Sequence, residues 1–391
     1  MHILVVSDGF PYPLTSGRIR QYHMLGGLAR RHRVTLVAAV PMDHPAEHAD
    51  ALAGRVHRIV TVPSLRLSRG VLRKATCRLL PRSTRDIERA IARIDGDERI
   101  DRVLNARLPV RFSEVLPGVP VVTDLCDAVP DGLRDRLRVA APLDLPLLVA
   151  KHRDSLRSEA QMINEADEIV FASTRDEAVV ARRRALPHVT IVPNGVDAAY
   201  WKRREPMLGI GTVVFAGAMP YAPNEDAALY LLADVMPRVR EHRPDTRLVI
   251  AGRDPGPRLF AAAALDERVE VTGYVEDLRP QLERAAVVVA PLRFATGIQN
   301  KILEAMAMAI PVVTTPVGEA GLLIPGELAP PISVAADAVG LAAAIVGKLD
   351  AAKRDPRPDA VARGWVMERF RWDTAIDHIE RLLDRASSRR G

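Results

Sequence analysis

The sequence has 391 residues, too many for one ordinary hydrophobic core and enough for two domains. Hydrophobic residues make up 48% and charged residues 27%, the balance of a soluble globular protein without low-complexity tails. The net charge of +6 admits an anionic partner, but aromatic residues make up only 4% and no zinc-finger spacing occurs, which argues against nucleic acid.

The N-terminus predicts a strand and not a signal peptide. No basic region precedes its apolar run, and no small-residue cleavage site follows. Every apolar stretch is strand-sized, so no transmembrane helix is expected. The two cysteines, Cys77 and Cys126, provide neither a disulfide framework nor a zinc spacing. We therefore expect a cytoplasmic, reduced protein. Its oligomeric state is left open.

Short apolar runs alternate with helical patterns along the first half, as in parallel α/β folds. The first strand is followed by a predicted helix over residues 16–31. Strands are predicted at residues 2–7, 33–40, 59–62, 102–105, 119–124, 168–173 and 190–193.

Residues 66–85 form a basic segment with seven positive side chains and no acidic one. As a helix, the segment would gather Val71, Leu72, Ala75 and Leu79 on one side. Such a helix suits peripheral contact with the inner membrane face, or an anionic acceptor. The alternative is a solvated face over a small apolar stripe, and the short apolar side favours it.

The strand–helix alternation restarts after a stretch without periodicity at residues 201–206, which predicts an interdomain linker. Two Rossmann-like domains follow: residues 1–203 and residues 204–365, with the C-terminal helix in 366–391 packing back on the first. Strands are predicted at residues 212–216, 247–251, 269–272, 287–290 and 312–314, and helices at residues 224–242, 257–265, 275–284, 297–308, 335–350 and 374–387. Neither half carries G-x-G-x-x-G after its first strand, and Walker A is absent.

The most informative stretch is residues 290–307, where a strand, a loop with Gly297 and a helix follow one another. Lys301 in the first turn opposes the helix dipole, and a Lys three residues before Glu304 is the poorer ion-pair orientation. Together with the amides of a helix N-terminus, this pattern is typical of a diphosphate site. Glu304 would accept hydrogen bonds from two ribose hydroxyls. The alternative is a surface Lys–Glu pair.

These residues resemble retaining GT-B transferases of glycosyltransferase family 4, in detail the bacterial exopolysaccharide-type sugar transferases. The resemblance covers nearly the whole chain, and residues 299–307 are its specific part. The matching stretches are residues 215–217, 244–245, 250–252, 272–275 and 297–313 in the second half, and residues 11–13 and 16–20 in the first.

The resemblance implies an α/β fold of the GT-B type, in which two Rossmann-like domains face each other across a cleft. Gly217 and Gly297 would let the backbone approach the donor, while Tyr274 and Val275 would face the base. Gly17 would close on the donor from the other domain. The expected donor contacts are Gly17, Gly217, Arg253, Tyr274, Val275, Arg293, Thr296, Gly297, Gln299, Asn300, Lys301 and Glu304.

The acceptor is expected at strand ends of the first half, since ligands of parallel sheets bind there. Asp124 would orient the acceptor hydroxyl, although capping a turn is an equal alternative for it. With Lys301 and Glu304 it completes the predicted catalytic set. The expected acceptor contacts are Arg18, Arg20, Arg107 and Asp127.

Three positions depart from the family pattern: Thr296 replaces a frequent Glu, and Ala218 and Asn224 replace the usual Arg and Lys. The diphosphate charge must then be met by Lys301, Arg253 or Arg293, or the donor site is impaired. An inactive GT-B partner subunit therefore stays an alternative, as does a nucleotide-sugar epimerase. A phosphorylase would need pyridoxal phosphate, and no lysine context for it is found.

The expected reaction is transfer from a nucleotide-diphosphate sugar, with UDP favoured, to a small-molecule or lipid-linked glycan hydroxyl. Retaining members of this fold are thought to use front-face attack, which needs no dedicated nucleophile. An inverting relative would need a base near the first loop, where Asp8 is the only candidate. No Asp-x-Asp stands at a strand end and the histidines are scattered, so neither metal nor cofactor is expected.

Overall fold

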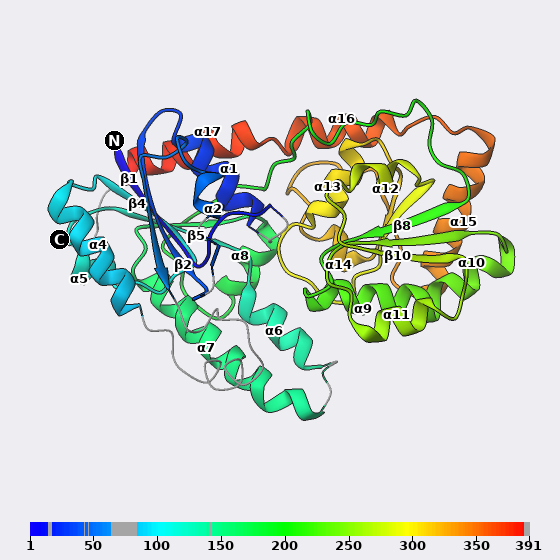
Figure 1. Cartoon of the computed structure of the whole chain (residues 1–391), viewed down its shortest axis with the longest axis horizontal. Coiled ribbons are helices and arrows are strands. Elements are labelled where there is room, and N and C mark those ends of the chain that lie inside the picture. The colour runs from blue at the N-terminus through cyan, green and yellow to red at the C-terminus, as the bar shows by residue number, and fades with distance from the viewer. Residues whose placement is uncertain are drawn as a thin grey trace. The chain divides into compact units, whose positions relative to one another are not determined.

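The computed structural model describes residues 1–14, 18–42, 44–45, 47–63, 84–138, 140 and 142–386. The chain divides into two compact units, Met1–Gly195 with Trp372–Gly391, and Val196–Arg371. Each unit is built around one parallel sheet covered by helices (Figure 1). We call them unit 1 and unit 2.

The sheet of unit 1 has seven strands, all parallel, in the order β3-β2-β1-β4-β5-β6-β7. The strand order reverses between β1 and β4, so the sheet is doubly wound. Ligands of such sheets usually bind at this switch point. The strands are β1 (His2–Ser7), β2 (Arg33–Val40), β3 (Arg58–Pro63), β4 (Arg102–Ala106), β5 (Val121–Cys126), β6 (Glu168–Phe171) and β7 (His188–Ile191).

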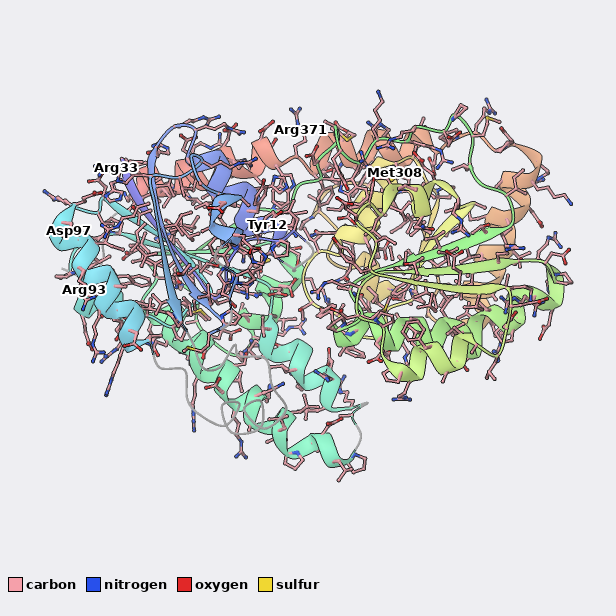
Figure 2. All side chains as sticks on the ribbon, in the orientation of Figure 1. Tyr12, Arg33, Arg93, Asp97, Met308 and Arg371 are labelled. Carbon is pink, nitrogen blue, oxygen red and sulfur yellow. The ribbon has the colours of Figure 1, made fainter. Side chains whose placement is uncertain are left out.

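The helices of unit 1 place apolar faces on the sheet. In α4, Ile87, Ile91 and Ile94 are buried, whereas Arg93 and Asp97 project from the outer face (Figure 2). The helices are α1 (Ile19–Leu28), α2 (Glu47–Asp50), α4 (Arg85–Asp97), α5 (Phe112–Val115), α6 (Val129–Leu137), α7 (Leu145–Asn164), α8 (Thr174–Ala181) and α17 (Trp372–Arg385), with a 3-10 turn η2 (Pro142–Asp144).

The C-terminal helix α17 packs on α1, so the predicted return of the chain to the first domain is confirmed. Gly27 of α1 allows this approach: a Cβ there would lie 2.3 Å from Cδ1 of Ile376. The ring of Trp372 stacks on His23 with centroids 4.4 Å apart. Ile379 and Leu383 of α17 join the same buried cluster as Leu25 of α1.

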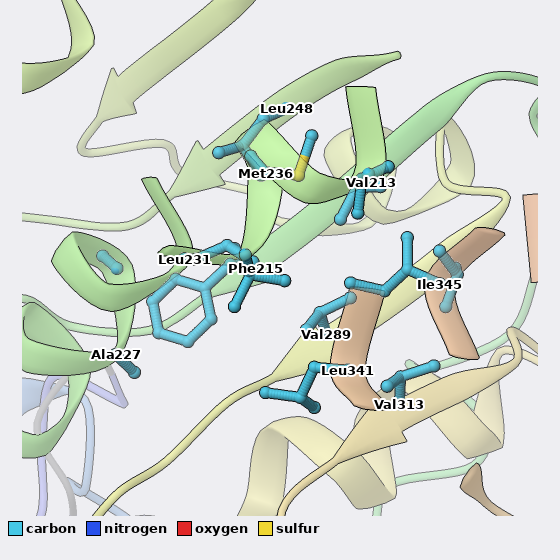
Figure 3. Packing of buried hydrophobic residues seen from close by; sticks show 14 of the residues in the cluster. Val213, Phe215, Ala227, Leu231, Met236, Leu248, Val289, Val313, Leu341 and Ile345 are labelled. Atoms are coloured by element: carbon cyan, nitrogen blue, oxygen red, sulfur yellow. The ribbon is translucent and has the colours of Figure 1, made fainter. Parts of the chain in front are cut away.

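Unit 2 has six parallel strands in the order β10-β9-β8-β11-β12-β13. They are β8 (Thr212–Ala216), β9 (Arg247–Ala251), β10 (Val269–Gly273), β11 (Val287–Ala290), β12 (Val312–Thr314) and β13 (Ser333–Val334). The core on one face of this sheet contains Val213, Phe215, Leu231, Val289 and Ile345 (Figure 3). The predicted pair of Rossmann-like parallel sheets is thus confirmed.

Several helices of unit 2 begin or end away from their predicted bounds. The predicted helix 224–242 is broken by the π-turn η3 before Pro237, which lacks an N–H to donate. The predicted helix 275–284 begins at Arg279, after a turn in which Arg279 N–H donates to Asp277. The elements are α9 (Ala222–Tyr230), η3 (Leu231–Val235), α10 (Met236–His242), α11 (Pro257–Ala263), α12 (Arg279–Glu283), α13 (Asn300–Ala307), α14 (Pro316–Glu319), α15 (Ala338–Arg354) and α16 (Ala360–Arg369).

The basic segment at residues 66–85 lies outside the described residues, except that Arg85 begins α4. Within the described ranges, no helix has both the length and the apolar character needed to cross a membrane.

Candidate functional site

Ligands of open parallel sheets bind beyond the carboxyl ends of the strands, and in unit 2 these include the ends of β8 and β11. Gly217 follows β8 directly, and the loop after β11 leads into α13. Gly297 in that loop has φ 69°, which is unfavourable for other residues, and α13 therefore begins at Asn300 and not at residue 297 as predicted. Its carbonyl oxygen would lie 2.5 Å from a Cβ at Gly321, so the loop is tightly packed.

The N-terminus of α13 lacks a side-chain cap from its N-cap residue. Gln299 occupies the N-cap position without a side-chain hydrogen bond to the helix, and its Nε2 donates instead to the carbonyl of Thr296 at 3.1 Å. A helix N-terminus at the end of a parallel strand is suited to an anion, because the helix dipole is positive there. Gln299 and Asn300 thus lie at this N-terminus and Thr296 just before it; their contact with a donor stays a prediction.

Lys301 points from the first turn of α13 toward α9. Its ammonium donates a hydrogen bond to Oδ1 of Asn224 and lies 5.2 Å from the ring centroid of Phe215. Burial lowers the pKa of Lys301 to about 8, and the charge of Glu304 opposes that shift. Lys301 is therefore a partly desolvated cation with donor capacity left beyond Asn224.

Asn224 connects Lys301 to the end of β8. Its Nδ2 donates to the carbonyl of Ala218 at 2.9 Å, and the side chain is buried. A Cβ on Gly217 would lie 2.6 Å from that Nδ2, so glycine is needed for the contact. Gly252 has φ 150°, and a Cβ there would lie 1.9 Å from the oxygen of Gly217. The ends of β8 and β9 can approach each other this closely because residue 252 is glycine.

Glu304 lies one turn after Lys301 and is half-buried. Burial raises the pKa of its carboxyl to about 7, with Lys301 opposing the shift. Among residues in the described ranges, the Glu304 carboxylate has neither a hydrogen bond nor an ion pair within 4 Å. A half-buried acceptor with open lone pairs is suited to vicinal hydroxyls.

The two arginines expected at the donor site are already paired with acids. Arg293 donates from Nε to Asp226 at 2.9 Å, and its guanidinium carbon lies 5.1 Å from the Tyr230 ring centroid. Arg253 donates to Asp254 at 2.7 Å. Lys301, the third predicted donor-site cation, instead donates to a neutral amide, that of Asn224.

Tyr274 and Val275 follow β10 in the loop that begins at Gly273, whose φ is 66°. Tyr274 is 63% exposed and Val275 is half-buried. The ring is therefore available for stacking. Near this loop, Tyr200 donates to Asp277 at 3.3 Å, and the charge of Glu304 is among the causes, after burial, that raise the pKa of Tyr200. Tyr200 is not among the predicted donor contacts, because no sequence motif surrounds it.

Unit 1 brings three of the predicted acceptor contacts together at the carboxyl ends of β1, β4 and β5. Arg18 pairs with Asp8, while Arg107 lies 3.6 Å from Asp8 and 2.9 Å from Asp127. These charges raise the pKa of Arg107, Asp8 most strongly. Arg107 has φ 67°, a conformation rarely held by a non-glycine residue, and strain of this kind concentrates at functional sites.

Arg20 and Asp124 form a separate buried pair. Arg20 is 2% exposed; its Nε donates to Asp124 at 2.6 Å and its Nη1 to the carbonyl of Val192 at 2.8 Å. Nη1 also donates to Oδ1 of Asn194 at 3.0 Å. This geometry ties α1 to the ends of β5 and β7. The acceptor role of Arg20 and the catalytic role of Asp124 stay predictions, and Gly17 lies outside the described residues.

No group of three or more His, Cys, Asp and Glu side chains within the described ranges is arranged to hold a metal ion. The independence of the reaction from metal and cofactor stays a prediction.

Comparison with known proteins gives the family context of unit 2. Residues 211–350 match the family described as glycosyl transferases group 1. The glycogen synthase of Mycobacterium tuberculosis is 30% identical over 229 residues, covering 55% of this chain and 53% of that protein. The chain spans about half the length of the curated relatives it matches first.

Solved structures resemble the whole chain. The sucrose-phosphate synthase of Thermosynechococcus elongatus superposes with a TM-score of 0.74 at 16% identity, over 98% of each chain. HepE of Anabaena, in complex with UDP and glucose, superposes with a TM-score of 0.68 at 14% identity, over 98% of this chain and 99% of that one. At these identities the likeness shows the fold, which is the two-domain GT-B architecture.

Proposed function

We propose that this protein is a glycosyltransferase that moves a sugar from a nucleotide-diphosphate sugar to an acceptor hydroxyl, with retention of anomeric configuration. The observation that carries the proposal is the grouping of Lys301, Glu304 and the α13 N-terminus at the end of β11. The match of residues 211–350 to glycosyl transferases group 1 supports it.

Each part of this site has a role in the proposed donor complex. The α13 amides and Lys301 would bind the diphosphate and stabilise the charge that develops as the sugar leaves. Glu304 would bind the ribose hydroxyls, and Tyr274 would stack on the base. We favour a UDP-sugar because HepE, one of the structural neighbours, was solved with UDP and glucose. Metal and cofactor are not part of this proposal.

Retention is supported by the environment of Asp8, the one acidic candidate for a base after β1. Its carboxylate pairs with Arg18 and lies 3.6 Å from Arg107. A carboxylate held between two guanidinium groups is a weak base, because both cations favour its ionised form. Front-face attack, in which the departing phosphate accepts the acceptor proton, needs no such base.

The second candidate function is that of an inactive GT-B partner subunit. It is favoured by Thr296 and by the pairing of Arg293 with Asp226, which reduces the positive charge available to a donor. An epimerase on the same fold would convert the donor without an acceptor. The protein would act in the cytoplasm, where nucleotide sugars are available.

A thermal-shift screen of nucleoside diphosphates and their sugars tests the proposal. A ligand at a hundred times its dissociation constant adds about 2.7 kcal/mol of stability. We expect one diphosphate to stabilise the wild type and the exposed-site control variants Lys353→Ala and Glu241→Ala, but neither Lys301→Ala nor Glu304→Ala. Absence of any shift in the wild type would favour the inactive partner. Donor turnover without acceptor would favour the epimerase.

A further inference from the structure

A pocket lies within unit 1, between the ends of β1, β4 and β5 and the helices α6 and α7. The space between its lining atoms is about 420 Å³, a figure that includes open solvent. In Figure 1, α6 and α7 run side by side below the sheet of this unit. The lining residues are Asp8, Arg107, Leu125, Asp127, Val129, Pro130, Ser155, Ser158, Glu159 and Met162.

One face of α7 supplies the hydroxyl groups of this pocket. Ser155, Ser158, Glu159 and Met162 are spaced at three and four residues, so they share one side of the helix. Ser158 is 6% exposed as a residue, and within the described ranges neither its hydroxyl nor that of Ser155 has a hydrogen-bond partner in the protein. Hydroxyls without a protein partner at a pocket wall can both donate to and accept from a polar ligand.

The charges around the pocket are already matched. Glu159 accepts from Nη2 of Arg183 with both carboxylate oxygens at 2.8 Å, and Arg183 also pairs with Asp131. Arg107 is held by Asp127 and Asp8.

The guanidinium among the described lining residues, that of Arg107, is already paired with Asp8 and Asp127, so an entering phosphate or carboxylate would have no uncommitted cation to bind. It would also have to displace a carboxylate from its arginine. An uncharged ligand meets no such cost, since carboxylates and serine hydroxyls readily bind neutral hydroxyl groups.

The remaining wall is apolar. Leu125 and Met162 are almost fully buried, and Val129 and Pro130 begin α6 beside them. A ring with C–H groups on one face and hydroxyls at its edge matches such a surface, since small-molecule pockets combine apolar walls with a few polar groups that orient the ligand.

We propose that this pocket selects an acceptor whose seated part is an uncharged, hydroxyl-bearing sugar ring, and that it excludes phosphorylated and carboxylated rings. The assignment of the ligand as acceptor depends on the proposed transferase function. The binding preference itself depends only on the pocket. Ser155 and Ser158 are the specificity-determining residues, and Arg107 and Asp127 complete the contacts at the strand ends.

Saturation-transfer NMR on the full chain with UDP tests this preference. The probes are methyl α-glucoside, methyl α-mannoside, glucose 6-phosphate and glucuronate. We expect at least one neutral glycoside to bind and neither anion to do so. The double variant S155A/S158A should weaken the neutral glycoside at least fivefold. The control S113A changes an exposed serine of the same unit and should not. Alanine is a good helix former, so the variant helix should persist.

A gain-of-function variant gives a second readout. S155K adds a cation at the pocket wall and should admit glucose 6-phosphate. The proposal is overturned if an anionic sugar binds the wild type as tightly as the neutral glycosides or more tightly. It is also overturned if S155A/S158A binds the neutral glycoside as tightly as the wild type does, or if UDP binds and none of the sugars does. Binding of neutral glycosides without any binding of nucleotides would leave the pocket preference standing and reject the transferase function.

Discussion

Lys301 on α13 donates a hydrogen bond to Asn224 on α9, and Asn224 in turn holds the carbonyl of Ala218 at the end of β8. The resemblance to family 4 places a basic residue at position 224, where this chain has a neutral amide. The ammonium of Lys301 therefore lies beside the side chain at position 224, where the family has its basic residue. We infer that α13 supplies the positive charge that α9 lacks.

An exchange of the two residues tests this relationship. Lys301→Ala should abolish nucleotide-diphosphate binding, since charge-assisted contacts to phosphate are the stronger hydrogen bonds. Adding Asn224→Lys to Lys301→Ala returns a cation to the same neighbourhood and should recover part of the affinity, measured by isothermal titration calorimetry with UDP. Asn224→Lys alone, which sets two cations side by side, serves as the control and should lose stability. Failure of the double variant to exceed Lys301→Ala would argue against the exchange.

The affinity for a UDP-sugar should be highest in a narrow pH range. In the protein without ligand, burial raises the pKa of the Glu304 carboxyl to about 7. Burial also lowers the pKa of the Lys301 amine to about 8. Below pH 7 the protonated Glu304 accepts fewer hydrogen bonds, and above pH 8 Lys301 loses its charge. The dissociation constant should therefore rise on both sides, and Glu304→Gln should remove the acidic limb. A flat profile between pH 6 and 9 would contradict the desolvated site.

Stability without ligand should show the opposite pH dependence. Glu304 binds its proton more tightly in the folded state than at its ordinary pKa of 4.5, so the free energy of unfolding falls as pH rises from about 4.5 to about 7. Lys301 binds its proton less tightly than at 10.5, so the free energy rises again from about 8 to about 10.5. Urea unfolding across this range measures both slopes. Glu304→Gln should flatten the first and Lys301→Met the second, and a variant that leaves its slope unchanged would refute the assignment.

Much of this architecture could be predicted because it depends on local patterns. β1, β2, β8, β9, β11 and β12 begin and end where the apolar runs do. β13 has only two residues, Ser333 and Val334, too few for a periodic signal, and it was missed. The start of α13 was misplaced because the backbone at Gly297 is left-handed, which the sequence alone does not specify.

The candidate site was only partly predictable for a related reason. Lys301 and Glu304 share one short helix, so their spacing brings them together. The contact of Lys301 with Asn224 joins positions 77 residues apart, and the pairing of Arg293 with Asp226 joins positions 67 apart. Neither pairing has a local signature. In contrast, the spacing of Ser155, Ser158, Glu159 and Met162 on α7 was a readable pattern whose meaning emerged only once the pocket was known.

The glycines at the ends of β8 and β9 should tolerate no side chain. Residue 252 has φ 150°, and in Gly252→Ala the added Cβ would lie 1.9 Å from the carbonyl oxygen of Gly217. The backbone at one of these two positions would therefore have to move. We expect a loss of about 2–4 kcal/mol, combining overpacking with strain at a positive φ. Gly26→Ala is the matched control: no atom lies within 4 Å of its Cβ, and helix α1 should gain about 0.5–1 kcal/mol. Equal stability of the two variants in urea unfolding would contradict the close approach of the strands.

The buried pair of Arg20 and Asp124 should behave as a structural unit. Both side chains are at most 5% exposed, so Arg20→Leu would leave Asp124 as an uncompensated buried charge. A loss of about 3–5 kcal/mol is expected, whereas Arg20→Leu with Asp124→Leu should recover most of it. Arg30 pairs with Asp373 across 3.4 Å in solvent, with both side chains more than 60% exposed, and Arg30→Leu should cost less than about 1 kcal/mol. Urea unfolding of the four proteins measures these differences. A double variant no more stable than Arg20→Leu would show that Arg20 matters through its contacts with Val192 and Asn194 and not through the charge of Asp124.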